Sequence, residues 1–194
     1  MKHIIIFTSR SAFTSIFLLI GVLFLHAQTY TLDNKTSFLQ VNGTSSLHDW
    51  HVDAEKQSGF IDFNNVDEVA INTIKFSVES ESLKSGKSGM DRNTYKALKT
   101  KSFKNIEFNL TTVESVAKVT KGVYNIKGKG KLIICGVTKI IPLDFKLMIK
   151  DKIMSISGEN TILMTDYGIK PPTALLGTIK TGDEIVIKYK TIFK

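Results

Sequence analysis

The sequence predicts an all-β fold: an antiparallel barrel with one short helix, preceded by an export signal. Three observations carry this prediction. Apolar and polar residues alternate with a period of two along most of the chain, which is the pattern of half-buried strands. One polar segment instead has the spacing of a helix, and an uncharged apolar run lies close to the N-terminus.

Residues 1–27 have the pattern of a secretory signal peptide. Lys2 and Arg10 supply positive charge, residues 16–25 are apolar, and the small residue Ala27 precedes Gln28. The apolar run is shorter than the roughly 20 residues of a membrane-spanning helix. Cleavage after Ala27 is therefore expected, which leaves residues 28–194 as one periplasmic domain. An uncleaved membrane anchor is the alternative.

Strands are predicted wherever apolar residues occupy every second position. The clearest alternation lies at 74–78, 106–110, 143–149 and 185–189, and earlier strands are expected near 29–32, 36–45, 48–54 and 58–63. Each run has one apolar and one polar face, as is typical of antiparallel strands. Closing such a sheet into a barrel removes its edges, and about eight strands leave room inside for one ligand. A filled β-sandwich would show the same periodicity.

The stretch from residue 124 to 134 carries lysines on one face and two glycines, Gly128 and Gly130, on the other. Glycine inside a strand weakens it and fills no space. One interpretation is that these positions leave empty volume inside the sheet; the other is that they mark a bulge or sharp bend, and the two are compatible. The sequence leaves both interpretations open.

Two segments interrupt the strand pattern, residues 82–102 and 165–182. In the first, Ser88 followed by Asp91 has the spacing of a helix start. Four residues of that helix would share one face: Met90, Thr94, Ala97 and Leu98.

The distribution of charge argues against nucleic-acid binding, and the single cysteine argues against an internal disulfide. The net charge is +8, but the lysines are dispersed among apolar residues, and no basic run interleaves with aromatic residues as nucleic-acid binding would require. The dispersed lysines are interpreted first as solvated strand faces, with weak contact with an anionic membrane surface as the secondary interpretation. The single cysteine, Cys135, lies in an apolar run and is interpreted as a packing residue.

The pair His48 and His51 is the best candidate for metal chemistry, since imidazoles beside Asp49 could ligate zinc or copper. On a strand, however, residues three apart point to opposite faces. A metal-dependent enzyme built on these histidines is therefore a less favoured alternative. We expect no metal, no cofactor and no catalytic residue.

Short motifs follow one another in a fixed order along residues 30–193. They are YTLD at 30–33, GTSSLHDW at 43–50, SL at 82–83, MD at 90–91, AL at 97–98, IEF at 106–108, GKL at 130–132, GVTK at 136–139, MTDYGI at 164–169 and GDEI at 182–185. In this order and spacing they resemble the YceI-like family of exported, lipocalin-like proteins associated with polyisoprenoid binding.

The resemblance implies an eight-stranded antiparallel lipocalin-like barrel with an apolar tunnel that the short helix covers at one end. It implies a long isoprenoid ligand, such as a polyprenol or an isoprenoid quinone, that is carried, stored or used in a stress response. It also adds a homodimer as one arrangement, since dimers are common among such barrels. Alternation then predicts the ligand-binding residues: Phe38, Trp50, Phe76, Met90, Leu98, Phe108, Ile126, Leu132, Phe145, Met164 and Tyr167. A non-catalytic structural or interaction module with a filled core is the main alternative.

Overall fold

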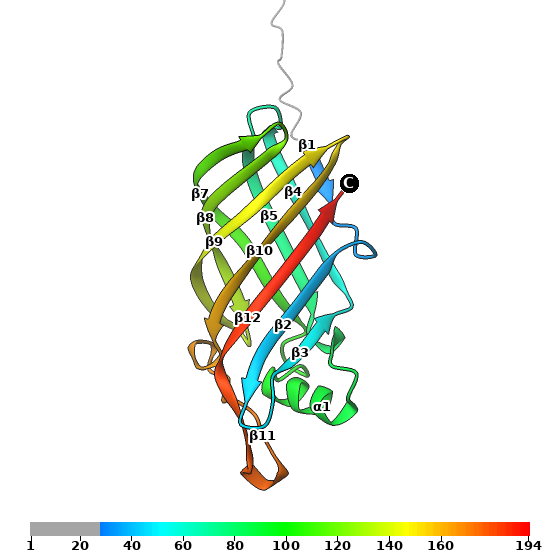
Figure 1. Ribbon diagram of the computed structural model, residues 1–194, viewed down its shortest axis with the longest axis vertical. Helices are drawn as coiled ribbons and strands as arrows, with labels where there is room; N and C mark the ends of the chain where they lie inside the picture. Colours follow the sequence, from blue (N-terminus) through cyan, green and yellow to red (C-terminus); the bar gives the residue numbers. More distant parts are fainter. Residues whose placement is uncertain (1–27) are drawn as a thin grey trace, which may run out of the picture.

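The structure is a computed structural model that describes residues 28–194 (Figure 1). The predicted signal segment, residues 1–27, lies outside the described residues. Within the described part of the chain, no helix combines the length and apolar character needed to cross a bilayer.

Strands dominate residues 28–194, with one α-helix and three short 3₁₀ turns. The strands are β1 (Gln28–Thr31), β2 (Phe38–Ser45), β3 (Trp50–Ala54), β4 (Gln57–Asn65), β5 (Ala70–Glu79), β6 (Leu83–Lys84), β7 (Asn105–Thr120), β8 (Val123–Ile134), β9 (Val137–Lys150), β10 (Ile153–Leu163), β11 (Thr173–Ala174) and β12 (Ile179–Phe193). The helix is α1 (Ser88–Ala97), and the 3₁₀ turns are η1 (Ser80–Ser82), η2 (Met164–Tyr167) and η3 (Leu175–Gly177).

One antiparallel sheet curls around to form the barrel (Figure 1). Its strand order is β1-β4-β5-β7-β8-β9-β10-β12-β2-β3-β6. At one end β1 meets β12, because Leu32 bridges Phe193 and the Thr31 N–H donates to the Lys194 carbonyl at 2.8 Å. At the other end β6, which follows β5 through η1, pairs with β3. The predicted all-β antiparallel barrel with one short helix is confirmed.

The strand count differs from the predicted eight, since residues 28–194 form twelve strand segments. Three long strands are each divided in two: β1 continues as β2, β3 as β4, and β5 as β6, at corresponding positions in the barrel. Asn34 supports one interruption: its side-chain amide donates to the Glu55 carbonyl at 2.8 Å, and its carbonyl oxygen accepts the Gln57 N–H at 2.7 Å. Side-chain hydrogen bonds of this kind satisfy backbone groups that the interrupted ladder leaves unpaired. The twelfth segment, β11, is a two-residue strand on β12.

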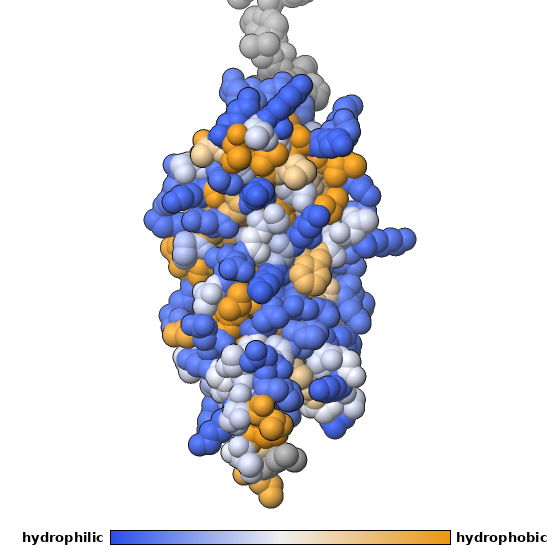
Figure 2. All heavy atoms as spheres, in the orientation of Figure 1, coloured by the Kyte–Doolittle hydropathy of each residue, from blue (hydrophilic) through white to orange (hydrophobic). Residues whose placement is uncertain are grey.

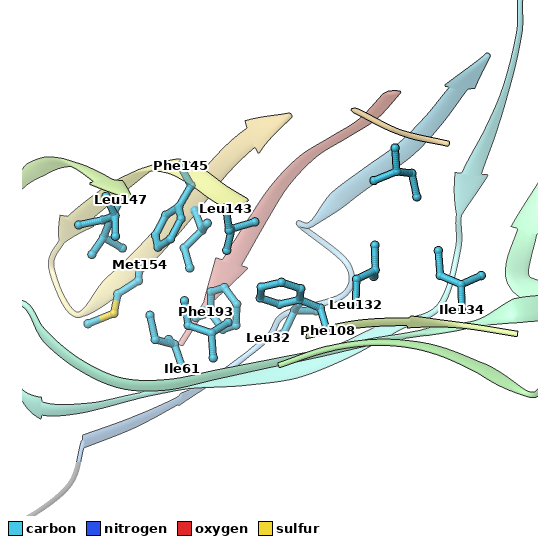
Figure 3. Close-up of a cluster of buried hydrophobic side chains, with 14 of the residues drawn as sticks. Leu32, Ile61, Phe108, Leu132, Ile134, Leu143, Phe145, Leu147, Met154 and Phe193 are labelled. Carbon is cyan, nitrogen blue, oxygen red and sulfur yellow. The ribbon is translucent and has the colours of Figure 1, made fainter. Parts of the chain in front are cut away.

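At one end of the barrel the inward side chains are fully buried. Ile61, Phe63, Leu147 and Met154 are each 0% exposed, and we call the region that they fill the packed end. Figure 3 shows Ile61, Leu147 and Met154 gathered in this region, beside Phe193. The packed end lies near β1 and the C-terminus, whereas α1 lies across the opposite end, which we call the α1 end (Figure 1).

The two glycines of β8 face strand irregularities rather than empty volume. The register of β7 shifts between Leu110 and Thr112 opposite Gly130, and again between Val113 and Ser115 opposite Gly128. A Cβ on Gly130 would lie 2.1 Å from the Cζ of Phe108, so the Phe108 ring occupies that space. The irregularity expected at these positions is therefore present, but the extra residues lie in β7 opposite the glycines, and the empty-volume interpretation is wrong at Gly130.

Helix α1 begins at Ser88 as expected, but not through the expected cap. The residue before the helix is Lys87, and it makes no side-chain cap hydrogen bond. The Asp91 carboxylate instead accepts hydrogen bonds from the Ser85 N–H at 2.8 Å and hydroxyl at 2.6 Å, which lowers the Asp91 pKa. At the other end of α1, the Cys135 Sγ lies 3.2 Å from the Leu98 carbonyl. Cys135 is buried in the main core cluster, consistent with a packing role.

Candidate functional site

A cavity of about 660 Å³ extends from α1 into the barrel, where Ile156 and Phe193 are among its lining residues. This volume falls within the range of roughly 300–1,000 Å³ typical of small-molecule sites. Inward side chains of most strands form its wall, and α1 residues, among them Met90 and Ala97, also line it. The cavity reaches the surface beside α1, where Lys87, Gly89 and Arg92 are exposed and line it.

Eight of the eleven predicted ligand-binding residues line this cavity. They are Trp50, Phe76, Met90, Leu98, Phe108, Leu132, Met164 and Tyr167. The predicted helix face also lies against the cavity as a unit, because Thr94 and Ala97 join Met90 and Leu98 in its lining. Contact of these residues with a ligand stays a prediction.

Three predicted residues lie elsewhere. Phe38 is 46% exposed on the outer face of β2, so its inward placement is wrong. Its neighbours Leu39 and Val41 face the cavity instead, because alternation in β2 has the opposite register. Ile126 and Phe145 do point inward, with exposures of 1% and 4%, but they lie in the core cluster and do not line the cavity.

Strand β12 contributes much of the cavity wall, although none of the predicted ligand-binding residues lies on this strand. Its lining residues are Ile179, Thr181, Ile185, Ile187, Tyr189, Thr191 and Phe193. Alternation at 185–189 predicted the strand correctly, and extending that alternation to the C-terminus would have found most of these residues. The contribution of Ile156, Asn160 and Ile162 from β10 carries the same signal less clearly, because a glycine and an asparagine interrupt the apolar series.

The two histidines diverge. His48 lies just before β3 and lines the cavity, whereas the His51 imidazole lies on the outer face, 3.9 Å from the Asp53 carboxylate. Across residues 28–194, no three His, Cys, Asp or Glu side chains come together as a metal-binding group.

The wall between β9 and β10 contains a polar interruption. Pairing of these strands stops at Gly158 opposite Phe145. Beyond that point the Asn160 side-chain amide donates to the Pro142 carbonyl at 2.7 Å, and the Tyr189 hydroxyl donates to the Asn160 side-chain oxygen at 3.5 Å. Burial, together with the nearby Asp144 carboxylate, raises the pKa of Tyr189 well above its usual value. Tyr189 and Asn160 therefore place neutral polar atoms on an otherwise mostly apolar wall.

Turn η2 follows β10 and adds a second tyrosine to the wall. Tyr167 is 1% exposed, and its hydroxyl has no hydrogen-bond partner among the described residues. Burial and the adjacent Asp166 carboxylate raise the pKa of Tyr167 to about 12. Tyr167 is thus an uncharged, buried side chain at neutral pH.

An apolar tip extends beyond the α1 end of the barrel. Turn η3 joins β11 to β12 there, and the Leu176 side chain is fully exposed. Figure 2 shows apolar surface at this extremity of the molecule, with hydrophilic residues above it. Residues at the base of the same hairpin, including Thr173 and Ile179, line the cavity.

The sequence matches the profile of one known protein family. The sequence profile of the family described as YceI-like domain matches residues 30–193. No curated protein matches the chain.

Three solved structures share the fold at low sequence identity. BcnA from Burkholderia cenocepacia is 15% identical, with a TM-score of 0.67 over 83% of this chain and 98% of its own. A polyisoprenoid binding domain from Saccharophagus degradans, implicated in plant cell wall breakdown, is 12% identical, with a TM-score of 0.68 over 85% of this chain and 97% of its own. A YCEI protein from Campylobacter jejuni is 18% identical, with a TM-score of 0.56 over 74% of this chain and 84% of its own.

Proposed function

The chain belongs to the YceI-like family, and from this premise we propose that it binds a long apolar lipid in the barrel cavity, without catalysis. The observation that carries the proposal is the cavity itself, whose wall consists mainly of aliphatic and aromatic side chains. A polyisoprenoid or an isoprenoid quinone is the ligand class that we favour. The polyisoprenoid binding domain of Saccharophagus degradans, which shares the fold, supports that choice.

The energetics of burial favour a long ligand over a short one. Removing one CH₂ group from water contributes about 0.8 kcal/mol, so a five-carbon isoprene unit contributes about 4 kcal/mol. Association costs roughly 4–15 kcal/mol in lost freedom of motion. One isoprene unit barely offsets that cost, whereas several exceed it. The packed end limits how far into the barrel such a chain can extend, because Ile61, Leu147 and Met154 fill the space there.

Trp50 provides a direct test, because it is the only tryptophan of the chain and it lines the cavity. Titration of the purified protein with geranylgeraniol is expected to change the tryptophan emission saturably, with one ligand per chain. A Trp50→Phe variant should keep the binding, measured by displacement of a solvatochromic apolar probe, and lose the emission signal. Unchanged emission together with no probe displacement would contradict the proposal.

We further propose that the protein is exported, with mature chain 28–194 in the periplasm, and that it exchanges lipid at a membrane surface. The cavity opens beside Lys87 and Arg92, and the exposed Leu176 lies on the hairpin at the same end. Cationic side chains attract anionic head groups, and an apolar tip can enter the interface. The homodimer expected from the family resemblance would show as a doubled mass in solution.

Vesicle sedimentation tests the membrane contact. We expect more binding to vesicles containing phosphatidylglycerol than to pure phosphatidylcholine, and several-fold less after Leu176→Asp, because a carboxylate at the tip opposes both insertion and the anionic surface. Val119→Asp is the matched control, since Val119 is 53% exposed in β7 near the turn at the opposite end. Equal losses from the two substitutions would rule out the hairpin tip as the contact.

A further inference from the structure

Two polar side chains lie deep in the cavity wall, close to the packed end. Tyr189 pairs with Gly158 of β10 and with Leu39 of β2. Four residues further along β12, Phe193 pairs with the buried Met154. At a strand rise of about 3.3 Å per residue, Phe193 lies about 13 Å from Tyr189 along β12. Ile179, at the cavity mouth, lies more than twice that distance from Tyr189 in the other direction.

The hydrogen bonds of this pair leave donors free. An asparagine amide carries two N–H donors, and within residues 28–194 Asn160 makes one donation, to the Pro142 carbonyl. The Tyr189 hydroxyl reaches the Asn160 oxygen at 3.5 Å, which is long for an O–H···O hydrogen bond. A ligand oxygen placed between the two side chains could accept from both the second amide N–H and the phenol.

Gly158 makes room for this arrangement. A Cβ at that position would lie 2.6 Å from the Tyr189 hydroxyl and 2.9 Å from the Asp144 carbonyl. The phenol can therefore lie across β10 and bring its hydroxyl toward Asn160 only because residue 158 lacks a side chain. The glycine is explained by the position of the tyrosine.

The charges around the pair favour a neutral partner. Burial keeps the Tyr189 phenol protonated, and the Asp144 carboxylate adds negative potential at the phenol, which disfavours a bound anion. The cationic side chains that line the cavity, Lys87 and Arg92, belong to α1 or to the residue before it, at the other end. An anion buried beside Tyr189 would lack a counter-charge, and leaving a charge unpaired in an apolar site is costly.

We propose that Tyr189 and Asn160 bind a neutral carbonyl or hydroxyl oxygen of the ligand, so that its polar end lies deep in the barrel and its apolar chain runs toward α1. This inference rests on the proposed function and deepens it, because it selects uncharged, oxygen-bearing lipids such as polyprenols and quinones over polyprenyl phosphates and plain hydrocarbons.

Three ligands with one carbon skeleton test the inference: geranylgeraniol, its phosphate, and the corresponding hydrocarbon without oxygen. The wild-type protein should bind the alcohol about tenfold more tightly than the hydrocarbon, as expected for two net hydrogen bonds, and the phosphate more weakly than the alcohol. Tyr189→Phe and Asn160→Leu should each reduce the preference for the alcohol while leaving hydrocarbon affinity within about twofold. Tyr30→Phe is the matched control, because it removes a hydroxyl that bonds Gln28 outside the cavity.

The possible results separate this inference from the proposed function. If the hydrocarbon binds and the alcohol is not preferred, or if the preference survives both substitutions, the polar site is wrong and the lipid cavity stands. A tighter-binding phosphate would overturn the neutral-ligand assignment. If none of the three ligands binds the wild-type protein, the proposed function fails and the polar site fails with it. Circular dichroism of each variant confirms that its fold is retained.

Discussion

Replacing Phe108 with arginine is expected to remove lipid retention almost completely. Phe108 lines the cavity, is 9% exposed, and pairs with Phe76 and Leu132 on the neighbouring strands. An arginine there would place an unpaired charge against an apolar ligand, at a cost of several kcal/mol. At 1.4 kcal/mol per factor of ten, lipid affinity should fall about a hundredfold. Quantification of lipid co-purified with each variant measures the effect.

Two further variants separate loss of binding from loss of folding. Lys129→Glu changes a charge on the outer face of β8, where Lys129 pairs with Glu114, and such exposed pairs contribute about 1 kcal/mol or less. It should therefore retain lipid. Val41→Trp fills cavity volume with an apolar side chain and introduces no charge, so it should fold and bind less lipid. Normal lipid content in both Phe108→Arg and Val41→Trp would show that the cavity is not the binding site.

Replacing Gly130 with alanine is expected to lower the free energy of unfolding by about 1–3 kcal/mol, the usual range for overpacking. The new Cβ would lie 2.1 Å from the Phe108 ring and 2.8 Å from the Asn109 carbonyl oxygen. The Phe108 ring would have to turn away, and the Asn109 carbonyl belongs to the ladder between β7 and β8. Urea-induced unfolding of the purified variant measures the change.

The matched control is Gly89→Ala, the same substitution in α1. The nearest atom to a Cβ there is the Arg92 guanidinium nitrogen at 3.8 Å, and alanine favours helix over glycine by roughly 0.5–1 kcal/mol. This variant should be neutral or slightly more stable. The cost at Gly130 should also shrink in a Phe108→Leu background, since part of the clash is with the ring. A Gly130→Ala protein as stable as wild type would contradict the close packing of β7 on β8.

Much of the barrel follows from the alternation of side chains, because strand periodicity and face are local properties. Runs such as 106–110 and 143–149 gave both the strand and its inward face. The predicted inward face was wrong at Phe38. The polar and apolar residues of β2 alternate weakly, and a shift of one residue exchanges the two faces of a strand. Nothing local distinguishes Phe38 from Leu39, and only pairing with β3 and β12 decides which one points inward.

The extent of the cavity could not be read from the sequence. Inward residues such as Ile126 and Phe145 have the same pattern as those that line the cavity, yet they lie in the core cluster. Whether an inward side chain meets a neighbour or a void depends on all the strands at the same height of the barrel. The filled-core alternative therefore describes the packed end. It does not describe the part of the barrel next to α1, where the cavity lies. Likewise, the polar pair of Tyr189 and Asn160 forms only through the pairing of β10 with β12.

Native mass spectrometry of the mature protein, purified without detergent from the envelope of the cells that express it, would show whether the barrel cavity holds a lipid. We expect one long-chain apolar lipid per chain, released by organic extraction and absent from the Phe108→Arg variant. A protein that is lipid-free in repeated preparations, and that takes up no polyprenol when one is supplied, would contradict this expectation.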